Sequence, residues 1–503
     1  MDPGGSERMS LAGKAKTGVD GLDEVLSGGL SRGHLFLLEG QPGAGKTTVA
    51  MQFLMEGARL GEACLYITLS ENEAELRETA ASHGWTLPAG IEIFELIPAE
   101  TLLDEEQQQS LLYSSDLELG EATKKIFDVM DRVKPKRVVI DSLSEIRLLA
   151  QSSLRYRRQI LSIKHFLSRY DATVLLLDDL TSEASDKTVH SVAHGVIRLE
   201  ELNPEYGAER RRMKIVKYRG QKYRGGYHDF TIMTGGLQVF PRLVANEHRI
   251  PFTRGLLPTG IAPFDNLLGG GVNTGTSTLI IGPAGTGKSL MAVVFAIAAI
   301  RRGEKAGLFI FDEELGILYD RMLGLGYDLQ ALRDSGDLLI EQVDAAELSP
   351  GEFAHRVRHC VTTNNIKTVV IDSLNGYQAA MPQEHSLILH MHELLQYLNR
   401  QGATTLMTIA QHGLVGDMQS PVDVTYLADT VILLRYFEAL GKVRRAVSVI
   451  KKRTGGHEST IREFRIGPKG LTIGEPLSEF QGVLKGVPTY VGATGPLIQE
   501  NEA

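Results

Sequence analysis

The feature that most constrains this sequence is a glycine-rich phrase that occurs twice. "GQPGAGKTT" spans residues 40–48 and "GPAGTGKSL" spans residues 282–290. Both fit the pattern Gly, four residues, Gly-Lys-Ser/Thr, in which backbone N–H groups wrap phosphate oxygens, the lysine adds a positive charge and the hydroxyl binds Mg²⁺. The predicted phosphate-binding residues are Gly40, Gly43, Gly45, Lys46, Thr47 and Thr48 in the first copy, and Gly282, Gly285, Thr286, Gly287, Lys288, Ser289 and Leu290 in the second.

Each phrase also has the surroundings that a phosphate loop requires. A short apolar run, "HLFLLEG" or "STLIIGP", enters the loop, and a helical pattern, "TVAMQFLMEGARLG" or "LMAVVFAIAAIRRG", leaves it. The N-terminus of such a helix favours an anionic phosphate. The alternative, a glycine turn that happens to carry a lysine, does not account for two copies.

The two phrases belong to a longer internal repeat. "TGVDGLDEVLSGGL" begins at Thr17 and "TGIAPFDNLLGGGV" at Thr259, an offset of 242 residues (259 − 17) that also separates Lys46 from Lys288 (288 − 46). The 503 residues therefore suffice for two domains, each with a full core. We expect a disordered N-terminus at 1–14, a first domain at 15–246, a second domain at 247–490 and a short flexible tail at 491–503.

Composition excludes several classes of protein. Hydrophobic residues make up 43% of the chain and charged residues 23%, which is ordinary for a globular protein, and the net charge of −9 argues against a protein that coats nucleic acid. The longest apolar run, 291–300, is too short to span a bilayer, and we expect no signal peptide. With only Cys64 and Cys360, we expect no disulfide framework, a cytoplasmic location and no membrane partner.

Two aspartates end β-branched runs downstream of the phosphate loops. Asp141 follows "KPKRVVI" and Asp372 follows "IKTVVI". A carboxylate at a strand end beside a phosphate loop can hold Mg²⁺, together with the loop hydroxyl of Thr47 or Ser289. The alternative is an aspartate that caps the next helix.

A second group of acids follows the second predicted strand of each half, which lies between the phosphate loop and the strand that ends in Asp141 or Asp372. Glu71 lies 25 residues after Lys46 (71 − 46), and Glu313, which follows Asp312, lies 25 residues after Lys288 (313 − 288). Hydrolysis needs a carboxylate that orients water, or a base that takes a proton from a hydroxyl. We predict catalytic roles for these acids; the alternative is an acid favoured by the helix dipole.

Late in each half a Lys-x-Arg pair ends a predicted strand. The pairs are Lys217 with Arg219 and Lys451 with Arg453. Residues two apart in a strand face the same side, so each pair presents two cations together. In a ring of subunits these cations can reach a γ-phosphate bound by the neighbour, where such a cation increases the rate by roughly 10³–10⁵. The alternative is a solvated basic strand end.

From about residue 10 to residue 490 the chain resembles the KaiC family, the tandem RecA-like ATPases and autokinases of the cyanobacterial circadian clock. The resemblance rests on the paired "TG" openings, both phosphate loops, both "IDS" strands and both Lys-x-Arg pairs. It implies an α/β fold of two tandem RecA-like P-loop NTPase domains, each a mostly parallel twisted sheet flanked by helices. It also implies a double-ring homohexamer that binds ATP and Mg²⁺ at subunit boundaries.

The resemblance further implies a division of labour, in which the first ring is mainly a slow ATPase and the second is a serine/threonine autokinase and autophosphatase. In the family, two adjacent acceptors lie a few residues before the "DT" of the strand that matches "DTVILLRY". Thr425 and Tyr426 hold those positions here. Because the familiar acceptors are Ser and Thr, Thr425 is the better candidate. The alternative is a Thr-Tyr pair that simply enters a strand.

The sequence also departs from the family pattern. The family has two successive glutamates after the second strand of each domain; this chain has Ser70-Glu71 and Asp312-Glu313, with Asp312 at the position of the expected proton acceptor. The short C-terminal tail argues against regulation by KaiA. A KaiB-like partner on the first ring, and a histidine kinase or another signalling protein as output, remain compatible with the sequence.

Two other classes of function share this kind of core. A RecA-like DNA-dependent ATPase would need basic loops, but the chain is acidic and "HGLVGDMQSPVD" contains no lysine or arginine. A scaffold that uses ATP only to assemble would bind nucleotide without turning it over.

Overall fold

The computed structural model describes residues 13–96, 111–150, 152–180, 188–203, 207–379, 384–411, 425–439, 441–468, 470–485 and 489–491. The chain divides into two compact units, Met1–Arg242 and Leu243–Ala503. The boundary predicted between residues 246 and 247 lies just inside the second unit. Of the predicted terminal segments only residues 13–14 and 491 are described, and Lys14 already belongs to strand β1 (Lys14–Ala15).

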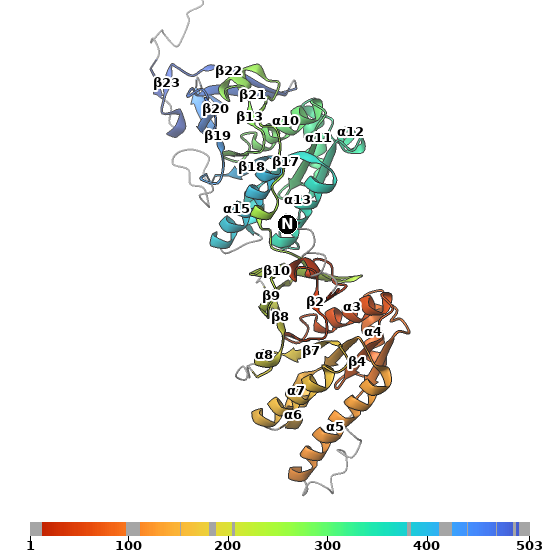
Figure 1. The fold of residues 1–503 in the computed structure, drawn as a ribbon. Helices are drawn as coiled ribbons and strands as arrows, with labels where there is room; N and C mark the ends of the chain where they lie inside the picture. The colour runs from red at the N-terminus through yellow and green to blue at the C-terminus, as the bar shows by residue number, and fades with distance from the viewer. Residues whose placement is uncertain are drawn as a thin grey trace, which may run out of the picture. The chain divides into compact units, whose positions relative to one another are not determined.

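A nine-stranded sheet forms the centre of the first unit (Figure 1). Its strand order is β11-β10-β9-β8-β3-β7-β6-β4-β5. The strands from β8 to β5 in this order are parallel, and β9, β10 and β11 extend one side as antiparallel neighbours. Their bounds are β3 Leu35–Gly40, β4 Cys64–Thr68, β5 Ile91–Glu95, β6 Arg137–Asp141, β7 Thr173–Asp179, β8 Gly195–Leu202, β9 Arg210–Tyr218, β10 Tyr227–Met233 and β11 Gly236–Phe240; β1 pairs separately with β2, Leu30–Ser31.

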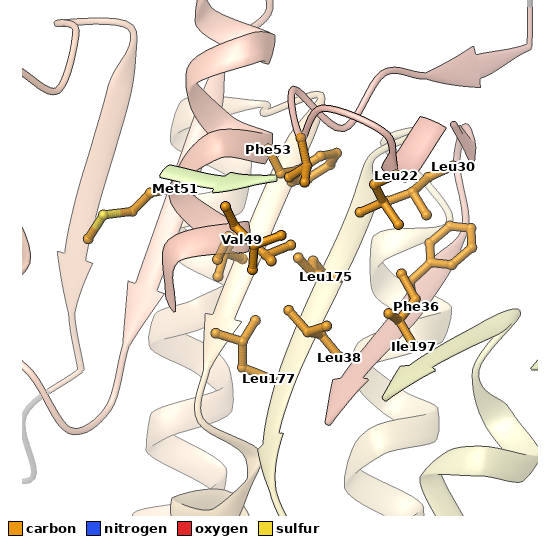
Figure 2. Close-up of a cluster of buried hydrophobic side chains, with 14 of the residues drawn as sticks. Leu22, Leu30, Phe36, Leu38, Val49, Met51, Phe53, Leu175, Leu177 and Ile197 are labelled. Atoms are coloured by element: carbon orange, nitrogen blue, oxygen red, sulfur yellow. The ribbon is translucent and has the colours of Figure 1, made fainter. Parts of the chain in front are cut away.

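Helices cover both faces of this sheet. One face packs against α2 (Leu22–Val25), α3 (Lys46–Arg59) and α4 (Glu73–Ser82), and the other against α5 (Leu111–Val133), α6 (Leu143–Ala150), α7 (Ser153–Leu167) and α8 (Thr188–Val192). Figure 2 shows Val49 and Phe53 of α3 over Leu38 and Leu175 of the sheet. Each such side chain stabilises the fold by about 1.5–3 kcal/mol when fully buried.

The second unit repeats this plan with its own nine-stranded sheet, in the order β16-β15-β17-β18-β14-β19-β20-β21-β22. The strands from β16 to β19 in this order are parallel, and the other three are antiparallel. Their bounds are β14 Ser277–Gly282, β15 Lys305–Ile310, β16 Leu338–Gln342, β17 Ile366–Asp372, β18 Thr404–Ala410, β19 Thr430–Ala439, β20 Lys442–Lys452, β21 Arg462–Gly467 and β22 Gly470–Pro476. Two short ladders pair β12 (Leu256–Leu257) with β13 (Val272–Asn273) and β23 (Phe480–Gln481) with β24 (Thr489–Tyr490).

The helices of the second unit also form two layers. α9 (Ala262–Leu267), α10 (Lys288–Arg301), α11 (Leu315–Gly324) and α12 (Leu329–Asp334) pack on one face, and α13 (Pro350–Thr363), α14 (Leu374–Ala379) and α15 (Glu384–Arg400) on the other; the 3₁₀ turns are η3 Ala245–Glu247 and η4 Val483–Lys485. The predicted α/β class, two tandem domains that each contain a mostly parallel sheet between helices, is confirmed. Within the described residues, no helix combines the length and the apolar character needed to cross a membrane.

The strand order gathers distant parts of the sequence at one edge of each sheet. The chain passes from β3 to β4 across β7 and β6, so the carboxyl ends of all four strands lie side by side. In the first unit the register pairs Gly40 with Asp179 and Thr68 with Asp141. Ligands of open α/β sheets bind at this edge, so the phosphate loops, the predicted Mg²⁺ ligands and the predicted catalytic acids of each half lie where a site is expected. The Lys-x-Arg pairs and the predicted acceptors lie at the opposite edge, because Tyr218 pairs with Gly195 beside the start of β3 and Lys452 pairs with Thr430 beside the start of β14.

Candidate functional site

The glycines of the first phosphate loop adopt a backbone that other residues rarely adopt. Gly43 has a φ of 82° and Gly45 a φ of 94°. A Cβ atom on Gly45 would also lie 2.6 Å from Ile232 Cδ1. These glycines turn the chain from β3 into α3, whose first residue is Lys46. A helix N-terminus, which attracts anions, therefore stands at the carboxyl end of the central strand.

The second loop has the same geometry. Gly285 and Gly287 have φ values of 75° and 103°, and Lys288 is the first residue of α10. The hydroxyl of Thr286 is fully buried and donates to the carbonyl of Pro283 at 2.8 Å, which fixes the loop internally. Both copies are therefore folded as phosphate loops.

A pocket opens beside the second loop. Its volume is about 570 Å³, and Lys288, Ser289 and Leu290 line one side while Arg321 of α11 and Ile466 of β21 line another. A cleft of this size suits a small-molecule ligand such as a nucleotide.

Asp141 lies deep in the first site. Its Oδ2 atom accepts a hydrogen bond from the Tyr66 hydroxyl at 2.6 Å and a longer one from Thr47 Oγ1 at 3.4 Å. Burial raises the pKa of Asp141, although the Tyr66 hydrogen bond and the charge of Lys46 oppose the shift. The predicted Mg²⁺ ligands of the first unit, Thr47 and Asp141, are therefore brought together.

Glu71 stands beside this aspartate, at the start of α4. Thr68 Oγ1 accepts from the Glu71 N–H at 3.0 Å and donates to the Glu71 carbonyl at 2.6 Å, while Asn72 and Glu75 cap the helix that follows. Burial raises the pKa of Glu71, and the negative charge of Asp141 adds to the shift. The Oε2 atom of Glu71 is buried and has no hydrogen-bond partner within the described residues, which suits a carboxylate whose partner is a substrate or a water molecule.

In the second unit the corresponding carboxylates have different partners. Asp372 accepts a hydrogen bond from the Thr408 hydroxyl of the neighbouring strand. Asp312 accepts a hydrogen bond from Ser373 Oγ at 2.5 Å. Because Ser373 directly follows Asp372 in the chain, this bond links the predicted base, Asp312, to the residue next to the predicted Mg²⁺ ligand, Asp372.

Glu313 is held separately from Asp312. Its Oε2 atom forms an ion pair with Arg321 at 2.5 Å, and burial nevertheless raises its pKa. The next acid, Glu314, caps α11 by accepting from the Ile317 N–H at 3.0 Å. Of the three successive acids, the last caps a helix, the first bonds Ser373 next to Asp372, and the second pairs with Arg321, which lines the pocket beside the phosphate loop.

In each unit the Lys-x-Arg pair holds a turn. This turn leads into the strand beside the phosphate-loop strand, which is β8 beside β3 in the first unit and β19 beside β14 in the second. In the first unit Lys217 Nζ donates to the carbonyls of His190 at 2.5 Å and Ala193 at 2.9 Å. Arg219 lies just past the end of β9 and donates to the Ser191 carbonyl at 2.5 Å. Both cations therefore point to the same side, as the spacing predicts.

The same arrangement recurs in the second unit, on the turn that contains the predicted acceptors. Lys451 Nζ donates to the carbonyl of Thr425 at 2.9 Å, and Arg453 donates to the carbonyl of Tyr426 at 2.6 Å. Arg453 also pairs with Asp429 at 3.4 Å. Tyr426 is 49% exposed. The predicted acceptors and the predicted cations are thus joined by hydrogen bonds.

His190 of the first unit corresponds in position to Thr425 of the second. The His190 carbonyl accepts from Lys217, and the Thr425 carbonyl accepts from Lys451. The His190 ring lies 2.7 Å from Glu39, which also pairs with Arg198 at 2.7 Å. The first unit therefore ties this turn to its phosphate-loop strand by polar side chains.

Several residues at these sites were not predicted from the sequence: Tyr66, Asp179, Ser373, Thr408 and Arg321. Only Asp179 carried a readable signal, because the apolar run "VLLLDDL" ends in acids as a strand at the ligand edge would. The others act through contacts between strands whose pairing no local pattern reveals.

The oxygen donors of the first site fit Mg²⁺. A hydroxyl and a carboxylate lie 3.4 Å apart beside a phosphate loop, and Mg²⁺ usually takes one or two protein oxygens and completes its shell with phosphate and water. Within the described residues no group of three His, Cys, Asp or Glu side chains is arranged to hold a metal by itself.

A phosphate loop at the carboxyl edge of a parallel sheet, entered by a central strand and left by a helix, defines a P-loop nucleotide-binding domain of the RecA-like class. This chain contains two of them in tandem. The family model of the KaiC ATPase matches residues 15–244 and 257–478, and the chain therefore belongs to the KaiC family.

Curated relatives match across nearly the whole chain. The circadian clock protein KaiC3 of Synechocystis sp. is 27% identical over 487 residues, which cover 95% of each chain. The circadian clock oscillator protein KaiC of Synechococcus elongatus is 27% identical over 500 residues, covering 97% of this chain and 93% of its own. That of Thermosynechococcus vestitus is 26% identical over 491 residues, covering 95% and 92%.

Proposed function

We propose that this protein is a Mg²⁺-dependent ATPase and a serine/threonine autokinase and autophosphatase that works as a double-ring homohexamer. The observation that carries the proposal is the anchored turn of the second unit. Lys451 and Arg453 hydrogen-bond the carbonyls of Thr425 and Tyr426. If these cations reach the γ-phosphate of an ATP held by an adjacent protomer, the acceptor hydroxyls arrive at the same place.

In this proposal the two phosphate loops hold the triphosphates, and Mg²⁺ binds Thr47 and Asp141 in the first unit and Ser289 and Asp372 in the second. Mg²⁺ would neutralise charge that develops on the phosphates. Glu71 is the residue that orients the attacking water in the first unit. Its raised pKa supports that role, as does its Oε2 atom, which has no hydrogen-bond partner in the part of the chain that the structure describes.

In the second unit Thr425 Oγ attacks the γ-phosphorus of ATP, the bond from that phosphorus to the bridging oxygen breaks, and ADP leaves. Asp312 takes the hydroxyl proton, with Glu313 beside it. Asp312 is exposed and accepts a hydrogen bond from Ser373, so an incoming hydroxyl can reach its carboxylate. Transfer in the opposite direction, from phosphothreonine to ADP, uses the same groups and gives the autophosphatase activity.

Phosphorylation would act as the signal. A phosphoryl group adds about −1.5 to −2 charges next to Lys451 and Arg453, which can then pair with it instead of the neighbour's ATP. The nucleotide and phosphorylation state could be recognised by a KaiB-like protein on the first ring, or by a histidine kinase or another signalling protein.

The test is intact-mass and peptide analysis of the full-length protein during hours of incubation with Mg-ATP, followed by ADP. We expect phosphate to accumulate on Thr425 and to decline after ADP is added. A peptide covering "VTYLADT" that stays unmodified throughout would rule out the autokinase.

Two variants serve as controls. Lys288→Ala should abolish phosphorylation by emptying the second site, while Thr425→Ala should remove the acceptor and leave ATP hydrolysis in place. Hydrolysis without any phosphorylation would reduce the proposal to an ATPase, and nucleotide binding without hydrolysis would indicate a scaffold.

A further inference from the structure

The phosphate-loop lysine of the first unit is already fully bonded within the chain. Lys46 Nζ donates to the carbonyls of Gly40 at 3.1 Å and Gln41 at 2.9 Å, and it pairs with Asp179 Oδ1 at 2.7 Å. An ammonium group has three donors, so these partners use all of them. Because Lys46 is only 8% exposed, water cannot substitute freely for a partner that leaves.

Among its described residues, the second unit has no equivalent of this contact. The sheet register pairs Gly40 with Asp179 in the first unit and Gly282 with Ala410 in the second, so a methyl group replaces the carboxylate. Lys288 Nζ donates to the Pro283 carbonyl at 2.8 Å, and within the part of the chain that the structure describes it has no carboxylate in ion-pairing distance. The two sites therefore differ at the atom that binds the β- and γ-phosphates.

We propose that Asp179 is a specificity-determining residue that competes with the γ-phosphate for Lys46, so that the first site discriminates against ATP relative to ADP more strongly than the second. The inference rests on the proposed function, because it requires nucleotide at the first phosphate loop. An incoming γ-phosphate must displace Asp179 from Lys46 and then lies beside its negative charge. ADP lets Lys46 keep Asp179 while its remaining bonds adjust to the β-phosphate.

The competition also gives the first site a way to release its product. When the γ-phosphate leaves after hydrolysis, Asp179 recaptures Lys46 and opposes rebinding of a triphosphate. The contact is partly exposed on the Asp179 side, where the side chain is 29% accessible, so solvent screens it and the effect is moderate. We expect about a tenfold effect on affinity.

The test measures the dissociation constants of Mg-ATP and Mg-ADP by calorimetry in the full-length protein, one site at a time. Lys288→Ala removes nucleotide binding from the second site, so that binding at the first site is measured alone. The comparison variant carries Asp179→Asn in addition to Lys288→Ala. We expect Asp179→Asn to tighten Mg-ATP binding by about tenfold while Mg-ADP changes by less than about threefold. The reciprocal pair uses Lys46→Ala to isolate the second site, where Ala410→Asp should weaken Mg-ATP by a similar factor.

The outcomes separate this inference from the proposed function. If neither isolated site binds nucleotide before Asp179 is changed, the proposed function fails. If both bind, but Asp179→Asn leaves the ATP-to-ADP ratio unchanged or weakens ATP, the competition does not exist. If circular dichroism shows that Asp179→Asn is not folded, the Ala410→Asp variant decides the question alone. An unchanged ratio of the Mg-ATP and Mg-ADP dissociation constants in that variant overturns the inference.

Discussion

Asp141 is a buried carboxyl group whose charge costs the folded protein stability. Burial raises its pKa, and a carboxyl with a raised folded-state pKa stabilises the fold below its unfolded pKa and loses that contribution as pH rises through the folded value. Without Mg²⁺ and nucleotide, Asp141→Asn should therefore raise the melting temperature at pH 8. We expect a gain of about 2–4 °C, the shift that roughly 1 kcal/mol gives in a domain of this size, and a smaller gain at pH 5.

Differential scanning calorimetry at both pH values checks this prediction. Asp128 on α5 is exposed and makes a suitable control, since Asp128→Asn should leave the melting temperature unchanged at both pH values. A lower melting temperature for Asp141→Asn at pH 8 would mean that the charge of Asp141 stabilises the fold.

Single residues also show what the sequence could and could not predict about the site. The φ values of Gly45 and Gly287 follow from the phosphate-loop pattern, because the chain must turn sharply there and only glycine tolerates the turn. The bond from Tyr66 to Asp141 joins residues 75 positions apart, and the bond from Asp179 to Lys46 spans a still longer segment. Such contacts depend on which strands are neighbours, and no local pattern specifies that.

At the scale of elements, the apolar runs beside the loops are strands β3 and β14, as predicted, and the helices that follow begin at the loop lysines. Hydrophobic periodicity identifies such elements, whereas strand order depends on crossovers between distant segments. The resemblance to a known family, rather than periodicity, predicted the tandem parallel sheets.

Lys451 is one of the residues that hold the turn at residues 425–427, together with Arg453. Lys451 donates to the carbonyls of Thr425 and Ala428, and hydrogen bonds from a charged donor are worth about 1.5–3 kcal/mol each. Lys451→Ala should therefore increase amide exchange at residues 425–429 by about 10- to 100-fold. Hydrogen exchange with mass spectrometry measures this directly.

A matched control comes from the other end of the same strand. Lys442 begins β20 and is exposed, so Lys442→Ala should leave exchange at residues 425–429 unchanged. Equal exchange in Lys451→Ala and the unmodified protein would show that the turn is held by its other contacts, and the proposed link between cations and acceptors would lose its support.

Across the whole molecule, the two units use one fold with different polarity at corresponding positions. The register pairs Glu39 with Arg198 in the first unit and Ile281 with Leu433 in the second. The first unit therefore fixes the turn before β8 with a buried acid, while the second fixes its turn through Ser277 at the start of β14, whose hydroxyl donates to the Leu427 carbonyl at 3.2 Å and whose N–H donates to Asp429 at 3.0 Å.

This difference predicts which unit holds the proposed hexamer together. Nucleotide bound between protomers stabilises the assembly by mass action, so emptying either site weakens it. In the proposed cycle, contacts at the second unit change whenever phosphate is added or removed, while those at the first, anchored by His190 and Glu39, do not. We therefore expect Lys46→Ala to reduce the hexamer fraction more than Lys288→Ala does, by light scattering after size exclusion in Mg-ATP. The reverse order would place the permanent interface in the second unit, and its phosphorylation would then have to control assembly itself.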